Sequence, residues 1–416
     1  MNIAAIITSI AIVFFGFAGG GGSSSGGGGG GGGGGSSYSS SHSSSSHSSS
    51  SSSSSDDSDW VLVLLTFGIT FLIIMAVVGK SGKSVNFKDY NSTAEEKEIH
   101  RKAEEIFKSY QADWSDFNTK GIKKYATEHY FKHAELMLEL LKDLHRANKV
   151  SKLKVKKVYL LDPVNENTGI PAHLRIAYRF SGLDEVITDE DEKLYSQYVP
   201  DATETWDFVY DGKNIKLSGI SQPTESAPHL VKSLASFADQ NNLFYSPDWG
   251  RYALPSRGLI FGGASMSIAD INNHVIGKMG DLLIQLYTYA EYPGQATSSY
   301  YIVGQINVPK DYLGVIVKSR KFNSGKKPDK SYEKFEMEWN EFNNRYEVYA
   351  ASRDALPAFE LLNPKFMEFL YSKNPAYSLE VVDNVIYIYA PISTVTEKDY
   401  NDMLEVLRKA FNELKM

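Results

Sequence analysis

The longest apolar stretch of the chain predicts a membrane span. Between Trp60 and Val78 there is no charged residue and no proline, and Gly68 is the single glycine. At about 1.5 Å per residue this stretch covers roughly 30 Å, the hydrocarbon thickness of a bilayer. A strand is usually much shorter than this. We therefore predict a transmembrane helix over residues 60–79.

Two Gly-Lys-Ser triplets follow this stretch and raise the alternative of a phosphate-binding loop. Such a loop needs the pattern G-x-x-x-x-G-K-[ST], because its first glycine lets the backbone turn toward the phosphates. The positions that would hold that glycine are Ile74 and Val77. The sequence therefore favours the membrane span.

Charges on either side of the span predict its direction. The residues before it are acidic and those after it are basic: Asp56, Asp57 and Asp59, then Lys80, Lys83 and Lys88. An excess of Lys and Arg marks the cytoplasmic side. We expect a single-pass protein of the cell membrane, with its N-terminus outside and its larger part in the cytoplasm.

The first 59 residues predict no folded domain. Residues 1–18 are apolar and fit either a signal peptide or a first hydrophobic segment. Residues 19–59 are almost entirely glycine and serine, a composition with nothing to bury, which is typical of a disordered linker.

Helical patterns open the part that follows the span. Thr93 and Glu96 have the spacing of a capping box, which marks the start of a helix. An apolar stripe at intervals of three and four residues continues from it: Ile99, Ala103, Ile106, Phe107 and Tyr110. A second helical pattern runs from Tyr130 and is predicted to stop near Asn148.

Alternating patterns then predict an antiparallel sheet. A strand is expected over residues 152–161, and a second carries Leu174, Ile176, Tyr178 and Phe180 on one face. A hairpin follows, with Trp206, Phe208 and Tyr210 on one face and a turn at Asp211-Gly212. Helices followed by a sheet with one apolar face predict an α+β domain in which the helices cover that face.

Residues 93–222 resemble a known family. The matching positions are Phe107, Ala112-x-Trp114, Tyr125 and Tyr130 in the helices, and Glu204-x-Trp206-x-Phe208 and Leu217-x-x-Ile220-x-Gln222 in the strands. The family is the C-terminal domain of the forty-four-kilodalton subunit of the mitochondrial inner-membrane import translocase, which has bacterial relatives. Ile215 departs from it, because the family usually has tryptophan there.

This resemblance implies a cone-shaped domain of the nuclear-transport-factor-two type. It also implies peripheral contact with acidic lipids and protein docking in place of catalysis. The acidic run from Asp184 to Glu192 is unusual for the family. We expect it to be a solvated loop, with docking of a basic partner as the alternative.

Residues 228–416 predict a second α+β domain of unknown function. A helix is expected over residues 230–242, and strand patterns include "ALPSRGLIF", "DLLIQLYTYAEY", "YYIVGQINV" and "NVIYIYAPI". Further helices are expected over residues 355–371 and 396–414. The stretch "FNNRYEVYAASRDALPAFELLNPKFMEFL" is similar to a bacterial membrane-protein family of unknown function.

Composition narrows the possible chemistry. The chain has no cysteine, which excludes disulfides, thiolate metal sites and cysteine nucleophiles. Its net charge of −7 argues against a nucleic-acid partner. His129 and His133 have a spacing that can bind one metal, but no third ligand is evident, and a solvated helix face is the expected reading. No cofactor is expected.

An enzyme is the least favoured function. Proton-transfer chemistry inside a cone needs an ionisable group on the inward face, and the inward candidates Leu174, Ile176, Trp206 and Phe208 have none. In the second domain Arg257 and His274 are available, but no motif groups them. The inward face can instead form a core, or a pocket for an apolar ligand such as a lipid chain. That pocket would be lined by Leu174, Ile176, Tyr178, Phe180, Trp206 and Phe208.

The densest basic stretch, "KDLHRANKVSKLKVKK", predicts contact with lipid. The lysines expected to contact the lipid surface are Lys149, Lys152, Lys154, Lys156 and Lys157. Lys152, Lys154 and Lys156 alternate and are expected to project from one strand face. Solubilising lysines on an exposed strand are the alternative. The first hypothesis is therefore a membrane-anchored scaffold that contacts anionic lipid and recruits an unidentified protein. An apolar-ligand carrier or sensor is the second.

Overall fold

The computed structural model describes most of the chain beyond residue 92. The described residues are 14–17, 20–23, 93–161, 172–221, 232–248, 250–262, 264, 266, 270–291, 299–321, 327–352 and 355–414. The short strands β1 (Phe14–Phe17) and β2 (Gly20–Ser23) pair antiparallel. The predicted transmembrane helix at 60–79 lies outside the described residues, and so does most of the predicted linker at 19–59. None of the described helices combines the length and apolarity needed to cross a bilayer.

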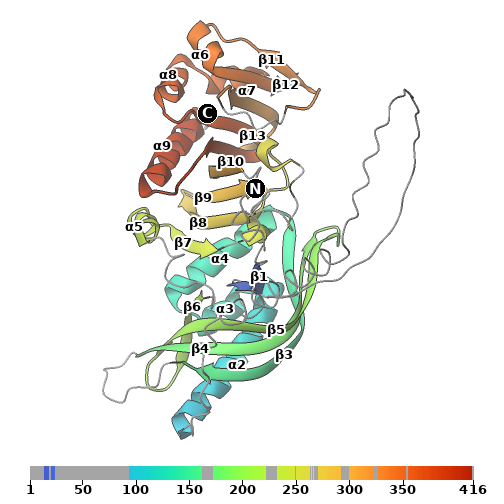
Figure 1. Cartoon of the computed structure of the whole chain (residues 1–416), viewed down its shortest axis with the longest axis vertical. Helices are drawn as coiled ribbons and strands as arrows, with labels where there is room; N and C mark the ends of the chain where they lie inside the picture. The colour runs from blue at the N-terminus through green and yellow to red at the C-terminus, as the bar shows by residue number, and fades with distance from the viewer. Residues whose placement is uncertain are drawn as a thin grey trace, which may run out of the picture. The chain divides into compact units, whose positions relative to one another are not determined.

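Three helices and a four-stranded antiparallel sheet form the first part of the folded region (Figure 1). The helices are α2 (Ala94–Ser115), α3 (Thr119–Tyr125) and α4 (Glu128–Asp143). The strands, in their order across the sheet, are β3 (Arg146–Leu160), β4 (Ala172–Thr188), β5 (Lys193–Tyr210) and β6 (Ile215–Ser221). β3 and β6 are therefore the two edges.

Helix α2 begins where the capping box predicts. The Thr93 hydroxyl accepts a hydrogen bond from the Glu96 N–H at 3.1 Å, and the Glu96 carboxylate accepts one from the Thr93 N–H at 2.9 Å. These two bonds satisfy N–H groups that have no partner within the helix. Of the predicted apolar stripe, Ile106 is half-buried and the other four residues are buried.

The helix that the sequence predicts from Tyr130 onward ends earlier than expected. Helix α4 stops at Asp143, and the next strand begins at Arg146, so the expected end near Asn148 is wrong. The cause is His145, which adopts a left-handed conformation with φ of 53° and turns the chain back into β3. Asn148 is consequently a strand residue, and β3 begins six residues before the predicted strand start at Lys152.

The predicted alternation of β4 and β5 is confirmed. Leu174, Ile176, Tyr178 and Phe180 on β4 are each at most 1% exposed. Trp206 lies opposite Ile176 in the register, so the inward rows of both strands share one face. The Asp211 carboxylate accepts hydrogen bonds from the N–H groups of Lys213 and Asn214, which closes the predicted hairpin turn.

The second part of the folded region contains a seven-stranded sheet. Its strands are β7 (Phe244–Asp248), β8 (Asp270–Met279), β9 (Leu282–Glu291), β10 (Ser299–Ser319), β11 (Tyr332–Phe335), β12 (Tyr346–Ala351) and β13 (Ser378–Pro391). The order across the sheet is β11-β12-β10-β9-β8-β7, and β13 also pairs with β10. The helices are α5 (Lys232–Gln240), η3 (Gly250–Ala253), η4 (Leu259–Phe261), α6 (Asn340–Arg345), α7 (Ala355–Leu361), α8 (Pro364–Ser372) and α9 (Glu397–Leu414).

Two predictions in this part are corrected. The stretch "ALPSRGLIF" does not form a strand, because most of it lies in or between the short helices η3 and η4. The helix predicted over residues 355–371 is two helices, α7 and α8. Asn363 caps the second by accepting a hydrogen bond from the Phe366 N–H at 3.0 Å, and Pro364 occupies its first turn. The mixed α+β class that the sequence predicts is confirmed.

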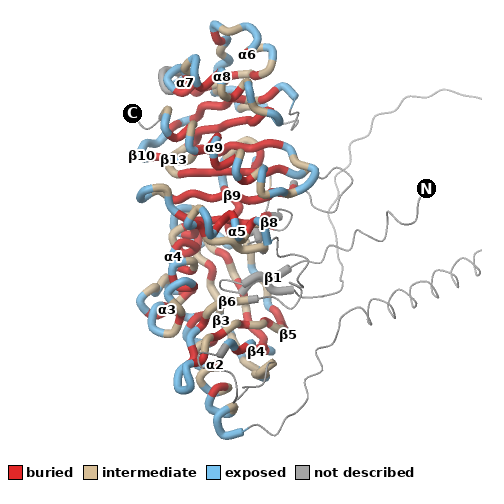
Figure 2. Tube along the Cα trace, turned by 90° about the vertical axis from the view of Figure 1, so that its left-hand side faces the viewer, coloured by how far each residue is buried: buried red, intermediate tan, exposed pale blue. Residues whose placement is uncertain are grey.

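Helix α9 packs against β10 (Figure 2), and Gly304 of β10 lies at this contact. A Cβ atom placed on Gly304 would lie 2.8 Å from Cγ and Sδ of Met403, and 3.1 Å from a methyl of Leu286. The absence of a side chain at Gly304 therefore sets how closely the helix approaches the sheet.

We predict that Gly304→Ala lowers the free energy of unfolding by about 1–3 kcal/mol, the usual cost of overpacking a core. Gly262→Ala is the matched control, because its Cβ would have only ordinary contacts of 3.5 Å or more. We expect that control to change stability by less than about 0.5 kcal/mol. Urea denaturation of both variants checks the difference, and equal values would contradict the close packing.

Candidate functional site

The inward face of the first sheet is filled by helix α2. The Phe107 ring lies 4.4 Å from Tyr178, 4.9 Å from Trp206 and 5.1 Å from Phe180, measured between ring centroids. Aromatic rings at these distances are in direct contact. The residues of the predicted apolar pocket, Leu174, Ile176, Tyr178, Phe180, Trp206 and Phe208, are all 1% exposed or less. Their arrangement is that of a packed core.

An ionisable group does lie on this inward face, contrary to the sequence-based prediction. Glu204 is fully buried, and its Oε2 accepts a hydrogen bond from the Trp206 indole N–H at 3.0 Å. The signal was present in the sequence, because Glu204 precedes Trp206 by two residues and therefore falls on the same strand face. It was missed because the alternation was read only through the apolar residues.

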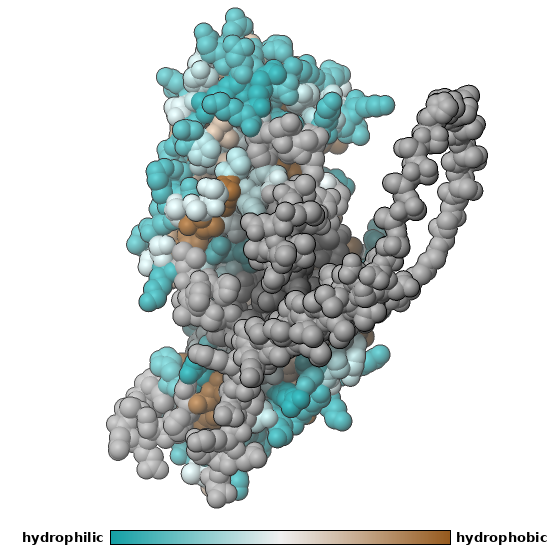
Figure 3. Space-filling view, in the orientation of Figure 1, coloured by the Kyte–Doolittle hydropathy of each residue, from teal (hydrophilic) through white to brown (hydrophobic). Residues whose placement is uncertain are grey.

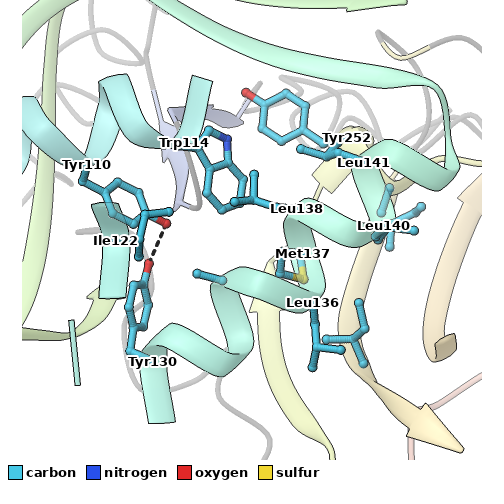
Figure 4. Packing of buried hydrophobic residues seen from close by; sticks show 14 of the residues in the cluster. Tyr110, Trp114, Ile122, Tyr130, Leu136, Met137, Leu138, Leu140, Leu141 and Tyr252 are labelled. Atoms are coloured by element: carbon cyan, nitrogen blue, oxygen red, sulfur yellow. Dashed lines mark hydrogen bonds between the residues drawn. The ribbon is translucent and has the colours of Figure 1, made fainter. Parts of the chain in front are cut away.

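Two buried tyrosines lie near enough to this carboxylate to be affected by its charge. Tyr110 on α2 and Tyr130 on α4 point toward each other, with their hydroxyls 3.1 Å apart (Figure 4). Burial raises the pKa of both tyrosines, and the negative charge of Glu204 adds to the rise. The Tyr125 hydroxyl donates to Asp113 at 2.8 Å, nearer the surface. The hydroxyls of Tyr110 and Tyr130 and the carboxylate of Glu204 are therefore polar groups inside an otherwise apolar core.

The basic strand β3 is exposed on an edge of the sheet. Four of the five predicted lysines are exposed, and the fifth, Lys149, is half-buried. The exposed ones are Lys152, Lys154, Lys156 and Lys157. As predicted, the exposed Lys152, Lys154 and Lys156 alternate with Leu153 and Val155, which are half-buried against the core. The register with β4 is nevertheless not continuous. The pairing with β4 shifts between Ser151 and Lys154, and again between Val155 and Lys157, because β3 carries an extra residue at each place.

Two of these lysines are bound within the protein. The Lys149 ammonium donates to the carbonyl of Ser115 and lies 3.5 Å from Asp116, so it neutralises the C-terminal end of helix α2. Lys156 donates to the Pro200 carbonyl at 2.6 Å and to Asp201 at 3.1 Å. The same Asp201 also pairs with Arg179.

Lys154 and Lys157 project from the side of the sheet away from the helices. Lys157 lies opposite Arg179 in the register, while Val155 and Val158 lie opposite the buried Phe180 and Tyr178. Hydrogen bonds from Arg179 and Lys156 lower the pKa of Asp201 to about 2, so this carboxylate is ionised at neutral pH. Together, four cationic side chains and one carboxylate make an outward cationic face: Lys154, Lys156, Lys157, Arg179 and Asp201.

A buried polar cluster joins β3 to the second part of the fold. The Arg146 guanidinium donates to the carbonyls of Tyr252, at 3.2 Å, and Leu254. Asp184 accepts hydrogen bonds from the Asn148 amide at 2.6 Å and from the Tyr252 hydroxyl at 2.5 Å. Asp184 is fully buried, so the acidic run that begins there is not a solvated loop along its whole length.

Two histidines of α4 also contact the second part of the fold. The rings of His129 and His133 on α4 lie 4.9 Å and 5.4 Å from the ring of Phe244 on β7. Burial, together with the nearby His274 and His129, lowers the pKa of His133 to about 3. His274 itself is fully buried, with its Nε2 2.9 Å from Gln285, and burial lowers its pKa to about 4. Within the described residues, no group of His, Asp and Glu side chains is arranged to hold a metal ion.

Comparison with known proteins identifies no family for the chain. No family model and no curated protein matches it. Among solved structures it is similar to the crystal structure of the mycobacterial trehalose monomycolate transport factor A, TtfA. That similarity has a TM-score of 0.35 and 12% sequence identity, and it covers 44% of this chain and 93% of the other. A similarity at this level carries no argument about function.

We predict that Asn148→Ala lowers the free energy of unfolding by about 1–3 kcal/mol. The substitution removes a partner from Asp184 and from the Trp114 indole N–H, which donates to Asn148 at 3.1 Å, and buried polar groups without partners are costly. Asn412→Ala on the exposed side of α9 is the matched control. Chemical denaturation checks the difference, and two variants of equal stability would show that the cluster contributes little.

We predict that stability falls as the pH drops from about 6.5 toward 4. The folded chain holds His274 neutral in this window, because its pKa is lowered to about 4, whereas the unfolded chain binds the proton near 6.5. His274→Gln should flatten this dependence in urea unfolding measured at several pH values. His173→Gln, at an exposed position, should leave the slope as in the wild type. A slope unchanged by His274→Gln would refute the assignment.

Proposed function

We propose that the chain is a membrane-anchored, non-enzymatic scaffold. In this proposal the span at residues 60–79 anchors it, a cone-shaped domain of the nuclear-transport-factor-two type follows at residues 93–222, and a second α+β domain follows at 228–416. The cytoplasmic modules contact anionic lipid and recruit a partner protein. The import-translocase resemblance of residues 93–222 supports the docking role.

The observation that carries the lipid contact is the outward cationic face. Lys154 and Lys157 are exposed on it, and no ion pair involves either of them within the described residues. The described surface beside β3 and β5 is largely hydrophilic in Figure 3. A lysine or arginine near an anionic membrane surface gains about 1 kcal/mol. Tethering would hold the domain close to the membrane, so that a weak contact suffices.

Alternative roles for this face and for the core are less well supported. Lysines on an edge strand also prevent pairing with other chains, which would explain their position without any ligand. The packing of Phe107 against Tyr178 and Trp206 disfavours the apolar-ligand carrier, because helix side chains occupy the face where a ligand would lie. The partner protein can be sought by proximity labelling in intact cells.

We predict that anionic lipid protects Lys154 and Lys157 from chemical acetylation. The full chain would be reconstituted into nanodiscs of phosphatidylcholine, with or without phosphatidylserine, and labelling rates read by mass spectrometry. At about 1 kcal/mol per lysine, each rate should fall by about fivefold in the anionic discs. High salt should remove the protection, because it screens charges beyond about a Debye length.

Lys365 is the matched control, because it is exposed on α8 in the second part of the fold. Its labelling rate should be the same in both kinds of nanodisc. Equal labelling of Lys154 and Lys157 in both lipids would overturn the proposed contact. Protection that ignores lipid charge would do the same.

A further inference from the structure

Tyr198 of β5 is among the most exposed large apolar side chains that the structure describes. It is 53% exposed, whereas its neighbour Val199 is 1% exposed and belongs to the core of the first part of the fold. Successive side chains of a strand point to opposite faces of the sheet. The Tyr198 ring therefore points away from the helices, to the side on which the outward cationic face lies.

The next residues of β5 connect Tyr198 to that face. Pro200 and Asp201 are exposed between two buried residues, so they lie on the same side of the sheet as Tyr198. The Pro200 carbonyl accepts a hydrogen bond from the Lys156 ammonium at 2.6 Å. Asp201 pairs with Lys156 and Arg179. An exposed aromatic ring and two cationic side chains are therefore neighbours on one surface.

The sheet register also connects Tyr198 to the basic strand β3. Tyr198 lies opposite Leu183 of β4, and Leu183 lies opposite Ser151 of β3. Leu183 is half-buried, and Ser151 is exposed. Lys154 follows Ser151 on β3 after the first register shift and is exposed as well. The side chains of Tyr198 and Leu183 thus form a small apolar patch beside the exposed lysines.

Two carboxylates near this patch are paired with cations. Asp201 is paired as described, and Glu185 of β4 lies 2.6 Å from the ammonium of Lys193. The exposed acidic turn at residues 189–192 ends six residues before Tyr198, roughly 20 Å away at about 3.4 Å per residue. That is about two Debye lengths at physiological ionic strength. The surface around Tyr198 is therefore able to approach a negatively charged surface.

We propose that the Tyr198 ring enters the headgroup region of an anionic bilayer and anchors the outward cationic face there. This inference rests on the lipid contact proposed above and names the residue that adds an apolar contact to it. An interfacial tyrosine keeps its ring in apolar surroundings and its hydroxyl in water. Tyr159, on the same side of the sheet, is half-buried, and the Lys157 ammonium lies 5.8 Å from its ring centroid. Tyr198 is the more accessible of these two rings.

The first test places an environment-sensitive fluorophore at position 198. The chain has no cysteine, so Tyr198→Cys provides a single thiol for a nitrobenzoxadiazole label. The full labelled chain would be studied in nanodiscs of phosphatidylcholine with or without phosphatidylserine. Fivefold protection of the lysines corresponds to contact in about 80% of the chains, so most of the emission should shift to shorter wavelength in the anionic discs. High salt should reverse the shift, because it screens the lysines.

Tyr300→Cys with the same label is the matched control, because Tyr300 is 51% exposed and lies on β10 in the second part of the fold. Its emission should be the same in both kinds of nanodisc. A label that enters lipid only through its own apolarity would shift at both positions.

The second test keeps the chain unlabelled and changes the ring itself. Tyr198→Ser should lower the protection of Lys154 and Lys157 from acetylation from about fivefold to about twofold, because the apolar area buried in lipid is lost. Tyr198→Phe keeps the ring and should retain the full protection. Tyr300→Ser should leave the protection as in the wild type.

The results that overturn the proposal also separate it from the lipid contact on which it rests. If Lys154 and Lys157 are protected by anionic lipid while the label at 198 shows no shift, or while Tyr198→Ser keeps full protection, the lipid contact stands without Tyr198. If the lysines are not protected either, both proposals fail. A shift at 198 that requires an added cytosolic protein in place of anionic lipid would assign the patch to a protein partner.

Discussion

The buried guanidinium of Arg146 is one of the contacts that join the two parts of the fold. It donates to the carbonyls of Tyr252 and Leu254, which belong to the segment that goes on to cover the second sheet. Burial lowers the pKa of Arg146 to about 10, a sign of how much solvation it has lost. Breaking this contact would leave a charge buried without its partners, which is far more costly than never having buried it. The strand that carries the exposed lysines therefore begins at a residue that is bonded to the second part.

The sequence predicted those features that depend on local periodicity. The capping box at Thr93, the inward rows of β4 and β5 and the turn at Asp211 follow from spacing alone. The end of α4 could not be read in this way, because it depends on the left-handed backbone of His145, a conformation that many residue types adopt only when the fold requires it. The stretch "ALPSRGLIF" likewise forms no strand. It runs from the last residue of η3 to the end of η4, and most of its apolar residues are buried without pairing in a sheet.

The candidate site was only partly predictable, for a different reason. Sequence shows how densely lysines gather along β3, but not what each ammonium contacts. Lys149 is bound to the end of α2 and Lys156 to Asp201, and both partners are distant in the sequence. Glu204 was predictable in principle, because it keeps the two-residue period of Trp206. A strand face must be read through all its residues, since a carboxylate with a suitable donor can be buried among aromatic rings.

The buried charged groups differ in how completely the fold supports them. Asp184 accepts from an amide and a hydroxyl, Arg146 donates to two carbonyls, and Glu204 accepts from an indole. The partners of Asp184 and Glu204 are side chains, and those of Arg146 are the backbone carbonyls of Tyr252 and Leu254. Glu380 instead depends on the Leu259 N–H, which belongs to a three-residue helix that a solvated ion pair helps to hold. Burial without an ion pair among the described residues raises the pKa of Glu380 to about 7, so this is the buried carboxylate of the four groups whose neutral form the fold favours.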